Sequence, residues 1–396
     1  MALGRNKTLG LGAVFAVIVG AAYFLSRPEP SLPLPEGSSA SPSAPPVFAG
    51  RLQAPSGTLS GVGRPQPEST ADDWPQRLRE AQERLGNYKR FARYPPGSRP
   101  AREHPDQMTP FLPVVRQSPL ILHGEANEDV RIQLGQDRRE LVADEAAKLW
   151  VRCEDSQGKV LPCKVAQATA MPAPPSDSKL PPVSLSFSDD GQNGDERAQD
   201  GTLTTSFQPS LLGFRSFHGT MRVQVQLALG KEQGSALFDL LYTPTAPARF
   251  TGTVKESRAD GSLQFVLGLS VQKAGRYFVV GRVDDQKEKQ IGYLQWEGEL
   301  APGNQTVSLT VFGKLIYDER PEFPLRLRDV EGFLFLEDSA PDRMHMPRLM
   351  GVVHKSQVYS VADFADTEWD GEMKRRYLDE YSKDVERAEK RDPNLP

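Results

Sequence analysis

The stretch MRVQVQLAL, from Met221 to Leu229, decides the fold class of this 396-residue chain. Apolar side chains stand at Met221, Val223, Val225 and Leu227, and the residues between them are mostly polar. Successive side chains of a β-strand point to opposite faces of the sheet, so this alternation is typical of a strand with one buried face. The stretch therefore predicts a half-buried β-strand.

Similar short stretches recur on both sides of it. They are Leu120–Gly124, Val130–Leu134, Leu149–Cys153, Val160–Ala166, Ala236–Tyr242, Phe250–Lys255, Ser262–Val271, Arg276–Val283, Gln290–Glu297 and Thr306–Phe312. Asp260-Gly261 is a hairpin turn signal between two of them. No helix-period stretches alternate with these strands, which disfavours a βαβ arrangement. The pattern predicts an all-β body of two antiparallel β-sandwich (Ig-like) domains in series, over residues 113–245 and 246–360.

Short helices are expected on both sides of this body. Residues 73–112 are predicted to be a helix and a Pro-rich connector, and residues 361–396 a charged C-terminal helix or tail. The first helix, Asp73–Arg93, is too short for a stable coiled coil alone, so we expect it to pack on the first sandwich. Its apolar stripe is Leu78, Ala81, Leu85, Tyr88 and Ala92. The following YPPGSRP, Tyr94–Pro100, is expected to stop the helix without forming regular structure.

Residues 8–26, TLGLGAVFAVIVGAAYFLS, contain no charge and no Pro. As a helix they would span roughly 28 Å, close to the hydrocarbon core of a bilayer. Arg5 and Lys7 precede the run, so residues 1–7 should stay in the cytoplasm as a stub while the rest is exported. We expect a single-pass signal-anchor in the bacterial inner membrane, with the body in the periplasm or outside the cell. A signal peptide cleaved near Ala22 is the alternative, and it also exports the body.

Residues 27–72 are dense in Pro, Ser and Gly and are predicted to be a disordered linker. The formal net charge is −4, which gives no reason to expect a nucleic-acid partner. The partners expected are instead the lipid bilayer, through residues 8–26, and an unidentified envelope or surface protein.

The two cysteines, Cys153 and Cys163, lie in a stretch that reads as strand, turn and strand. Gly158 is the midpoint between them, so the two side chains should face each other across a hairpin. Opposed Cα atoms in such a hairpin lie ~4.5–5.5 Å apart, which suits a disulfide. Export makes oxidation feasible, and two free thiols are the alternative.

The segment DDGQNGDERAQDG, residues 189–201, is the sharpest local signal for a metal. Clustered carboxylates and turn carbonyls supply the oxygen ligands that Ca²⁺ needs. The candidate calcium ligands are Asp189, Asp190, Asn193, Asp195 and Asp200. The loop departs from an EF-hand, because Gly191 stands at its third position and no helices flank it. A polar Asp/Gly turn held by its own hydrogen bonds is the alternative.

The stretch SFSDDGQNGDERAQDGTLTTSF, Ser186–Phe207, resembles the aspartate-glycine signature of bacterial choice-of-anchor X surface domains. The likeness continues in Ala274–Phe278, Leu300–Gly303, Val311–Ile316 and Gln357–Phe364. This resemblance implies a β-rich exported module with a role in the envelope or at the cell surface. It implies no particular reaction and no metal site.

The sequence lacks the motifs G-x-S-x-G, H-E-x-x-H and C-x-x-C and a phosphate-binding Gly loop, so we expect no enzyme. The segment Arg343–His354 holds Met and His side chains that could bind Cu(I), although Met also fills gaps in apolar cores. The function expected is a non-enzymatic structural or protein-interaction module of the envelope, with no cofactor. The alternative is a calcium-binding or ligand-sensing envelope protein that uses the Asp189–Asp200 loop. A hydrolase assembled from distant residues is third.

Overall fold

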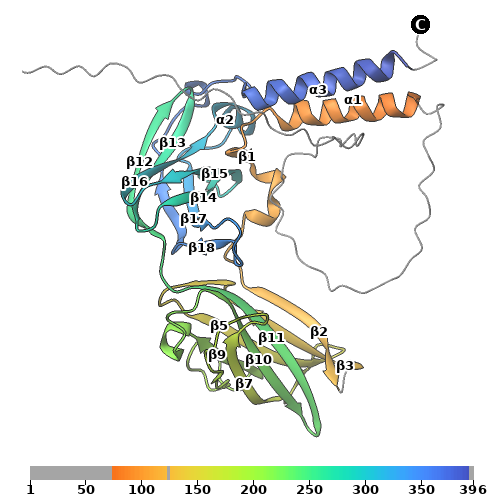
Figure 1. The fold of residues 1–396 in the computed structure, drawn as a ribbon, viewed down its shortest axis with the longest axis vertical. Helices are drawn as coiled ribbons and strands as arrows, with labels where there is room; N and C mark the ends of the chain where they lie inside the picture. Colours follow the sequence, from red (N-terminus) through yellow and green to blue (C-terminus); the bar gives the residue numbers. More distant parts are fainter. Residues whose placement is uncertain (1–73, 123–124, 392–396) are drawn as a thin grey trace, which may run out of the picture. The chain divides into compact units, whose positions relative to one another are not determined.

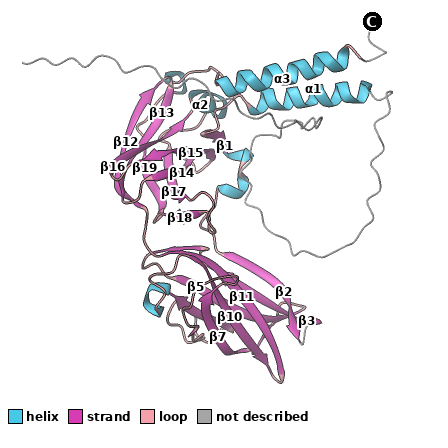
Figure 2. Cartoon of the chain, viewed as in Figure 1, coloured by secondary structure: helices cyan, strands magenta, loops and turns pink. Residues whose placement is uncertain are grey.

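The computed structural model describes residues 74–122 and 125–391, all within one compact unit, Glu68–Pro396. The cytoplasmic stub, signal-anchor and linker expected at residues 1–72 lie outside the described residues. Within the described part, no helix combines the length and the apolar character needed to cross a membrane. The regular structure there is mostly β-strand, as predicted, and the strands pair almost entirely antiparallel (Figure 2).

Ten strands between residues 114 and 243 form one hydrogen-bonded sheet, which we call the first sheet group (Figure 1). They are β2 (Val114–Leu122), β3 (Glu125–Gln136), β4 (Glu140–Val142), β5 (Ala147–Asp155), β6 (Val160–Leu161), β7 (Lys164–Pro172), β8 (Val183–Ser184), β9 (Thr202–Phe207), β10 (Gly219–Leu229) and β11 (Glu232–Thr243). Their order is β6-β5-β3-β2-β11-β10-β7-β8, with β9 on β5 and β4 parallel to β11. One 3-10 turn, Pro209–Leu212, lies between β9 and β10.

The stretch that predicted the fold lies on β10, between β11 and β7. Met221, Val223 and Val225 have no exposed surface, and Leu227 is 1% exposed. They pack in one core with apolar side chains from β3, β5 and β11. The alternation read from the sequence is therefore confirmed as the buried face of a strand.

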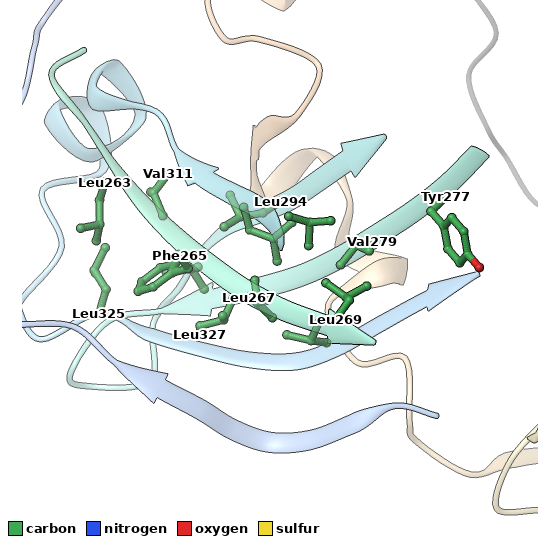
Figure 3. Close-up of a cluster of buried hydrophobic side chains, with 14 of the residues drawn as sticks. Leu263, Phe265, Leu267, Leu269, Tyr277, Val279, Leu294, Val311, Leu325 and Leu327 are labelled. Atoms are coloured by element: carbon green, nitrogen blue, oxygen red, sulfur yellow. The ribbon is translucent and has the colours of Figure 1, made fainter. Parts of the chain in front are cut away.

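The second sheet group has a β-sandwich-like arrangement of two sheets. One contains β12 (Ala248–Ala259), β13 (Ser262–Val271) and β16 (Gly303–Val311). The other contains β1 (Ser98–Pro100), β14 (Gly275–Asp284), β15 (Gln290–Leu300), β17 (Arg326–Phe335), β18 (Arg343–His345) and β19 (Leu349–Lys355). Side chains of both sheets form one core, and Figure 3 shows Leu263, Phe265, Leu267 and Leu269 of β13 inside it. Helix α2 (Gly313–Glu319) contributes Leu315 and Ile316 to the same core.

The segment after the first helix was expected to lack regular structure, and this expectation is wrong. Ser98–Pro100 forms β1, which pairs antiparallel with β15 at the end of its sheet. An edge strand needs hydrogen bonds on one side only, so it tolerates Pro100. Two 3-10 turns follow, Ala101–Glu103 and Pro105–Gln107. Strand β1 of the second sheet group therefore precedes the first sheet group in the sequence. The two groups are not simply in series.

The terminal helices pack on each other rather than on the first sheet group (Figure 1). They are α1 (Trp74–Phe91) and α3 (Glu372–Glu389), and a 3-10 turn at Val361–Asp363 precedes α3. The Tyr88 ring lies 5.5 Å from that of Tyr377 and 5.3 Å from that of Tyr381. Tyr88 of the predicted apolar stripe of α1 thus packs against α3, which corrects the expectation that the first helix packs on the first sandwich.

Candidate functional site

The acidic segment lies in the connection between β8 and β9 of the first sheet group. Its start is fixed to β9, because Ser188 and Thr204 exchange two backbone hydrogen bonds of 2.9 and 2.8 Å. The chain then turns at Asn193 and Gly194, which have φ angles of 52° and 94°. This left-handed turn brings the later acidic residues back towards Asp189.

Three of the predicted ligands come together in this loop. Carboxylate oxygens of Asp189, Asp195 and Asp200 all lie within 4.8 Å of one another. Asp195 is 9% exposed, while Asp189 and Asp200 are half-buried. This is the group among the described residues whose geometry suits a hard cation.

Backbone N–H groups hold each of the three carboxylates. Asp189 accepts from the amides of Asp200 at 3.1 Å and Gly201 at 2.8 Å. Asp195 accepts from Gly191 at 2.6 Å and from Arg197 at 3.3 Å. These bonds partly satisfy the carboxylates without a metal, and they orient the oxygens towards a common point.

Asp190 does not belong to this group of carboxylates. Asp190 accepts instead from the Ser188 hydroxyl at 3.1 Å and from the Gln192 amide at 2.9 Å. Asn193 has a left-handed backbone conformation and forms part of the turn. The structure thus brings three carboxylates of the predicted ligand set together, and the calcium site stays a prediction.

The electrostatics of the loop favour the ionised form of Asp200. Burial acts against ionisation, but hydrogen bonds from Thr202 and the charges of Arg152 and Arg197 outweigh it and lower the pKa of Asp200. On the rim of the loop, Lys148 pairs with Glu196 at 2.7 Å. The loop thus concentrates negative charge at the point where its three carboxylates meet.

The predicted disulfide is present in the first sheet group. Cys153 and Cys163 are bonded, and their Cα atoms lie 6.1 Å apart. The expected register is wrong, however, because Cys153 on β5 lies opposite Leu161 of β6. Pro162 ends β6 after two residues, since it has no N–H to donate, and Cys163 reaches Cys153 from beyond that strand.

The structure places Met346 and His354 of Arg343–His354 in different surroundings. Met346 is 3% exposed and packs in the core of the second sheet group. The His354 ring lies instead beside the Glu256 carboxylate, with Nε2 and Oε2 3.2 Å apart. This arrangement gives no support to a copper site.

The Glu256 carboxylate lies at the centre of a polar cluster that the sequence did not predict. It accepts from the Tyr359 hydroxyl at 2.6 Å and from the Gln357 amide at 3.1 Å, besides its contact with His354. Burial, assisted by Glu256, raises the pKa of Tyr359 to about 12. The partners stand about a hundred positions apart in the sequence, so no local motif could have indicated the cluster.

No protein-family model matches the chain, and no curated protein matches it. Among solved structures, it is similar to the crystal structure of a DUF4785 family protein from Legionella pneumophila subsp. pneumophila str. Philadelphia 1, with 15% sequence identity and a TM-score of 0.38. The match covers 59% of this chain and 58% of that one. The chain thus spans less than two thirds of that protein, and no argument about fold or function is drawn from so distant a likeness.

Proposed function

We propose that the chain is a non-enzymatic structural or protein-interaction module of the bacterial cell envelope, with its body in the periplasm or outside the cell. The observation that supports this best is the disulfide between Cys153 and Cys163. Disulfides persist in oxidising compartments and are rare in the cytosol. Both cysteines belong to the core of the first sheet group, where Cys153 has no exposed surface and Cys163 is 9% exposed.

The proposal includes three finer elements. Residues 8–26 serve as an uncleaved signal-anchor, and residues 27–72 hold the body away from the membrane. The two sheet groups are Ig-like β-sandwiches. The likeness of Ser186–Phe207 to choice-of-anchor X domains supports a role at the cell surface.

Export and oxidation can be tested together in bacterial cells that produce the full-length chain. Cells are acid-quenched, and thiols are labelled with a polyethylene-glycol maleimide before and after reduction. We expect two labels only after reduction, and recovery in the membrane fraction after alkaline extraction. A Cys153→Ser variant is the control, since its remaining thiol should label without reduction. Free thiols in the wild-type chain, or a soluble cytoplasmic location, would contradict the proposal.

Calcium binding is the second candidate function. It is favoured by the convergence of the Asp189, Asp195 and Asp200 carboxylates within 4.8 Å of one another. A cation there would offset their mutual repulsion and stabilise the native state. The measurement is the melting temperature of the full-length chain in detergent, with millimolar Ca²⁺ and with a chelator.

The matched variants are Asp195→Asn within the group and Asp190→Asn just outside it. A calcium site predicts that Ca²⁺ raises the melting temperature of the wild type and of Asp190→Asn, and raises that of Asp195→Asn much less. Equal melting temperatures of the wild type with Ca²⁺ and with the chelator would remove this candidate.

A further inference from the structure

Strand β11 is paired along its whole length on one side and only at its ends on the other. β10 pairs with it from end to end. On the opposite side, the described residues give a single pairing with β2, at Gly234, and a short parallel pairing with β4 that begins at Leu241. On that side, the described structure gives residues 235–240 no paired strand. We call this stretch of strand edge the β11 gap.

The direction of the hydrogen bonds identifies which backbone groups face the gap. The Leu241 amide donates to the Arg139 carbonyl of the segment leading into β4, at 2.8 Å. Alternate residues of a strand present their N–H and C=O groups to the same side, so Leu237 and Asp239 also face that side. Their backbone groups form the row that an added strand would bond to.

One side chain already occupies part of this row. Arg116 of β2 donates from Nη2 to the Leu237 carbonyl at 3.0 Å. The guanidinium thus stands where the N–H of a neighbouring strand would stand. It leaves the Leu237 N–H and both backbone groups of Asp239 without a strand partner in the described structure.

The sequence of β2 explains why this strand does not close the gap. Pro119 has no N–H to donate, and the pairing of β2 with β3 shifts register between Pro119 and Leu120. Leu120, after the shift, is 1% exposed in the core, whereas Val115, before it, is 50% exposed. The strand therefore changes its relation to the core at the proline, and its first half is not paired with β11.

An apolar and a basic side chain stand at the gap. Leu237, on the gap edge of β11, is 42% exposed, and Val115 of β2 is 50% exposed. Arg116 is exposed at the gap itself. Asp239, the acidic residue of β11 within the gap, is paired with Arg222 through two hydrogen bonds of 2.8 Å, which offsets its charge. The surface therefore complements an apolar segment with negative charge.

We propose that the β11 gap binds an extended segment of a partner protein by β-strand addition. The segment carries apolar side chains at alternate positions and an acidic residue that pairs with Arg116. Its backbone N–H replaces the guanidinium at the Leu237 carbonyl, and the released guanidinium binds the carboxylate. This inference rests on the proposed function as an interaction module, and it names the surface and the chemistry of the partner.

The test uses a defined probe and the full-length chain in detergent. The probe is a fluorescein-labelled octapeptide of alternating Val and Thr with one central Glu in place of Thr. Fluorescence anisotropy measures its Kd, and hydrogen exchange with mass spectrometry measures protection of residues 235–240. We expect saturable binding and at least a tenfold slowing of exchange in that segment.

Two altered peptides test the mode of binding. A peptide with N-methyl groups at alternate residues cannot form a strand ladder and should bind at least tenfold more weakly. A peptide with Lys in place of Glu should weaken to a similar extent, because it repels Arg116. Equal binding by either peptide would overturn the corresponding part of the proposal.

Variants of the chain locate the site. Leu237→Lys and Arg116→Glu should each raise the Kd at least tenfold while leaving the melting temperature unchanged. Leu211→Lys is the matched control, since Leu211 is 70% exposed but lies on the 3-10 turn before β10. It should leave the Kd unchanged. Equal effects of Leu211→Lys and Leu237→Lys would overturn the assignment to the β11 gap.

Three further results would also overturn the proposal: no binding of the probe, binding without protection of residues 235–240, and protection by self-association of the chain. The last result is detected by sedimentation of the chain without peptide, and it would assign the gap to a second copy. None of these results affects the outcome of the disulfide and fractionation experiment. Failure here is therefore distinguishable from failure of the proposed function.

Discussion

Arg282 donates a 2.6 Å hydrogen bond from Nη2 to the Glu331 carboxylate, although the Arg282 side chain has no exposed surface. Its other nitrogen atoms are also bonded, Nε to the Gln107 carbonyl at 2.7 Å and Nη1 to the Asp329 carbonyl at 2.8 Å. One buried guanidinium thus joins β14, β17 and the 3-10 turn Pro105–Gln107. This contact holds the early segment of the chain in the second sheet group.

We expect Arg282→Ala to destabilise the protein by about 3 kcal/mol, because it removes a buried guanidinium and deprives two carbonyls of this donor. The measurement is the free energy of unfolding in denaturant. Arg276→Ala is the control, since Arg276 is 46% exposed in its pair with Glu297, and its loss should leave the free energy of unfolding nearly unchanged. Similar losses in both variants would contradict the structural role of Arg282.

Reduction of the Cys153–Cys163 disulfide should lower the free energy of unfolding by about 3 kcal/mol, because the bond closes a short loop in the unfolded chain. The measurement is denaturant unfolding with and without reductant. The double variant Cys153→Ala with Cys163→Ala should match the reduced wild type and should not respond to reductant. A reductant effect on the double variant would show that the loss has another origin.

The sequence predicted the bond between the two cysteines but not the register of their strands. The spacing of Cys153 and Cys163 predicted the bond, because both lie on a local strand-turn-strand unit. The predicted strand register was wrong because β6 ends before Pro162. The strands themselves were predictable because the period-2 pattern of β10 and the turn at Asp260-Gly261 are properties of neighbouring residues.

Such local patterns did not predict the contacts between distant segments. β1 pairs with β15 almost two hundred residues later, and nothing in SRP, residues 98–100, indicates that partner. The loop of aspartates was recognisable by composition. Which carboxylates converge depends on the turn at Asn193 and Gly194, and composition alone did not separate Asp190 from the other three.

A close packing of Trp150 over Gly135 gives another prediction. The two residues lie opposite each other on β5 and β3, and a Cβ on Gly135 would overlap the indole ring. Gly135→Ala should therefore displace the ring, destabilise the protein by about 1–3 kcal/mol and change the tryptophan fluorescence. In Gly86→Ala, on the other hand, the new Cβ meets nothing within 4 Å in α1, so stability should rise by up to about 1 kcal/mol. A neutral Gly135→Ala would contradict the packing.

His345 on β18 predicts a dependence of stability on pH. Burial lowers its pKa to about 3, and the charges of Arg343 and Arg348 act in the same direction. In the unfolded chain the pKa is about 6.5, so between these values the unfolded state binds the extra proton. The stability associated with neutral His345 is therefore complete above about pH 6.5 and is lost as the pH falls towards 3, with a slope of at most about 1.4 kcal/mol per pH unit.

The comparison that isolates this effect is between the wild type and His345→Gln, because the carboxylates titrate alike in both. Burial also lowers the pKa of His218, so His218 likewise destabilises the protein as the pH falls. Burial raises the pKa of Glu140, so Glu140 favours the folded state as the pH falls. Both are retained in the variant. We expect the free energies of unfolding of the two proteins to converge as the pH falls from about 7 to about 4. Parallel profiles would mean that His345 takes up its proton equally in both states, and the low pKa would then be wrong.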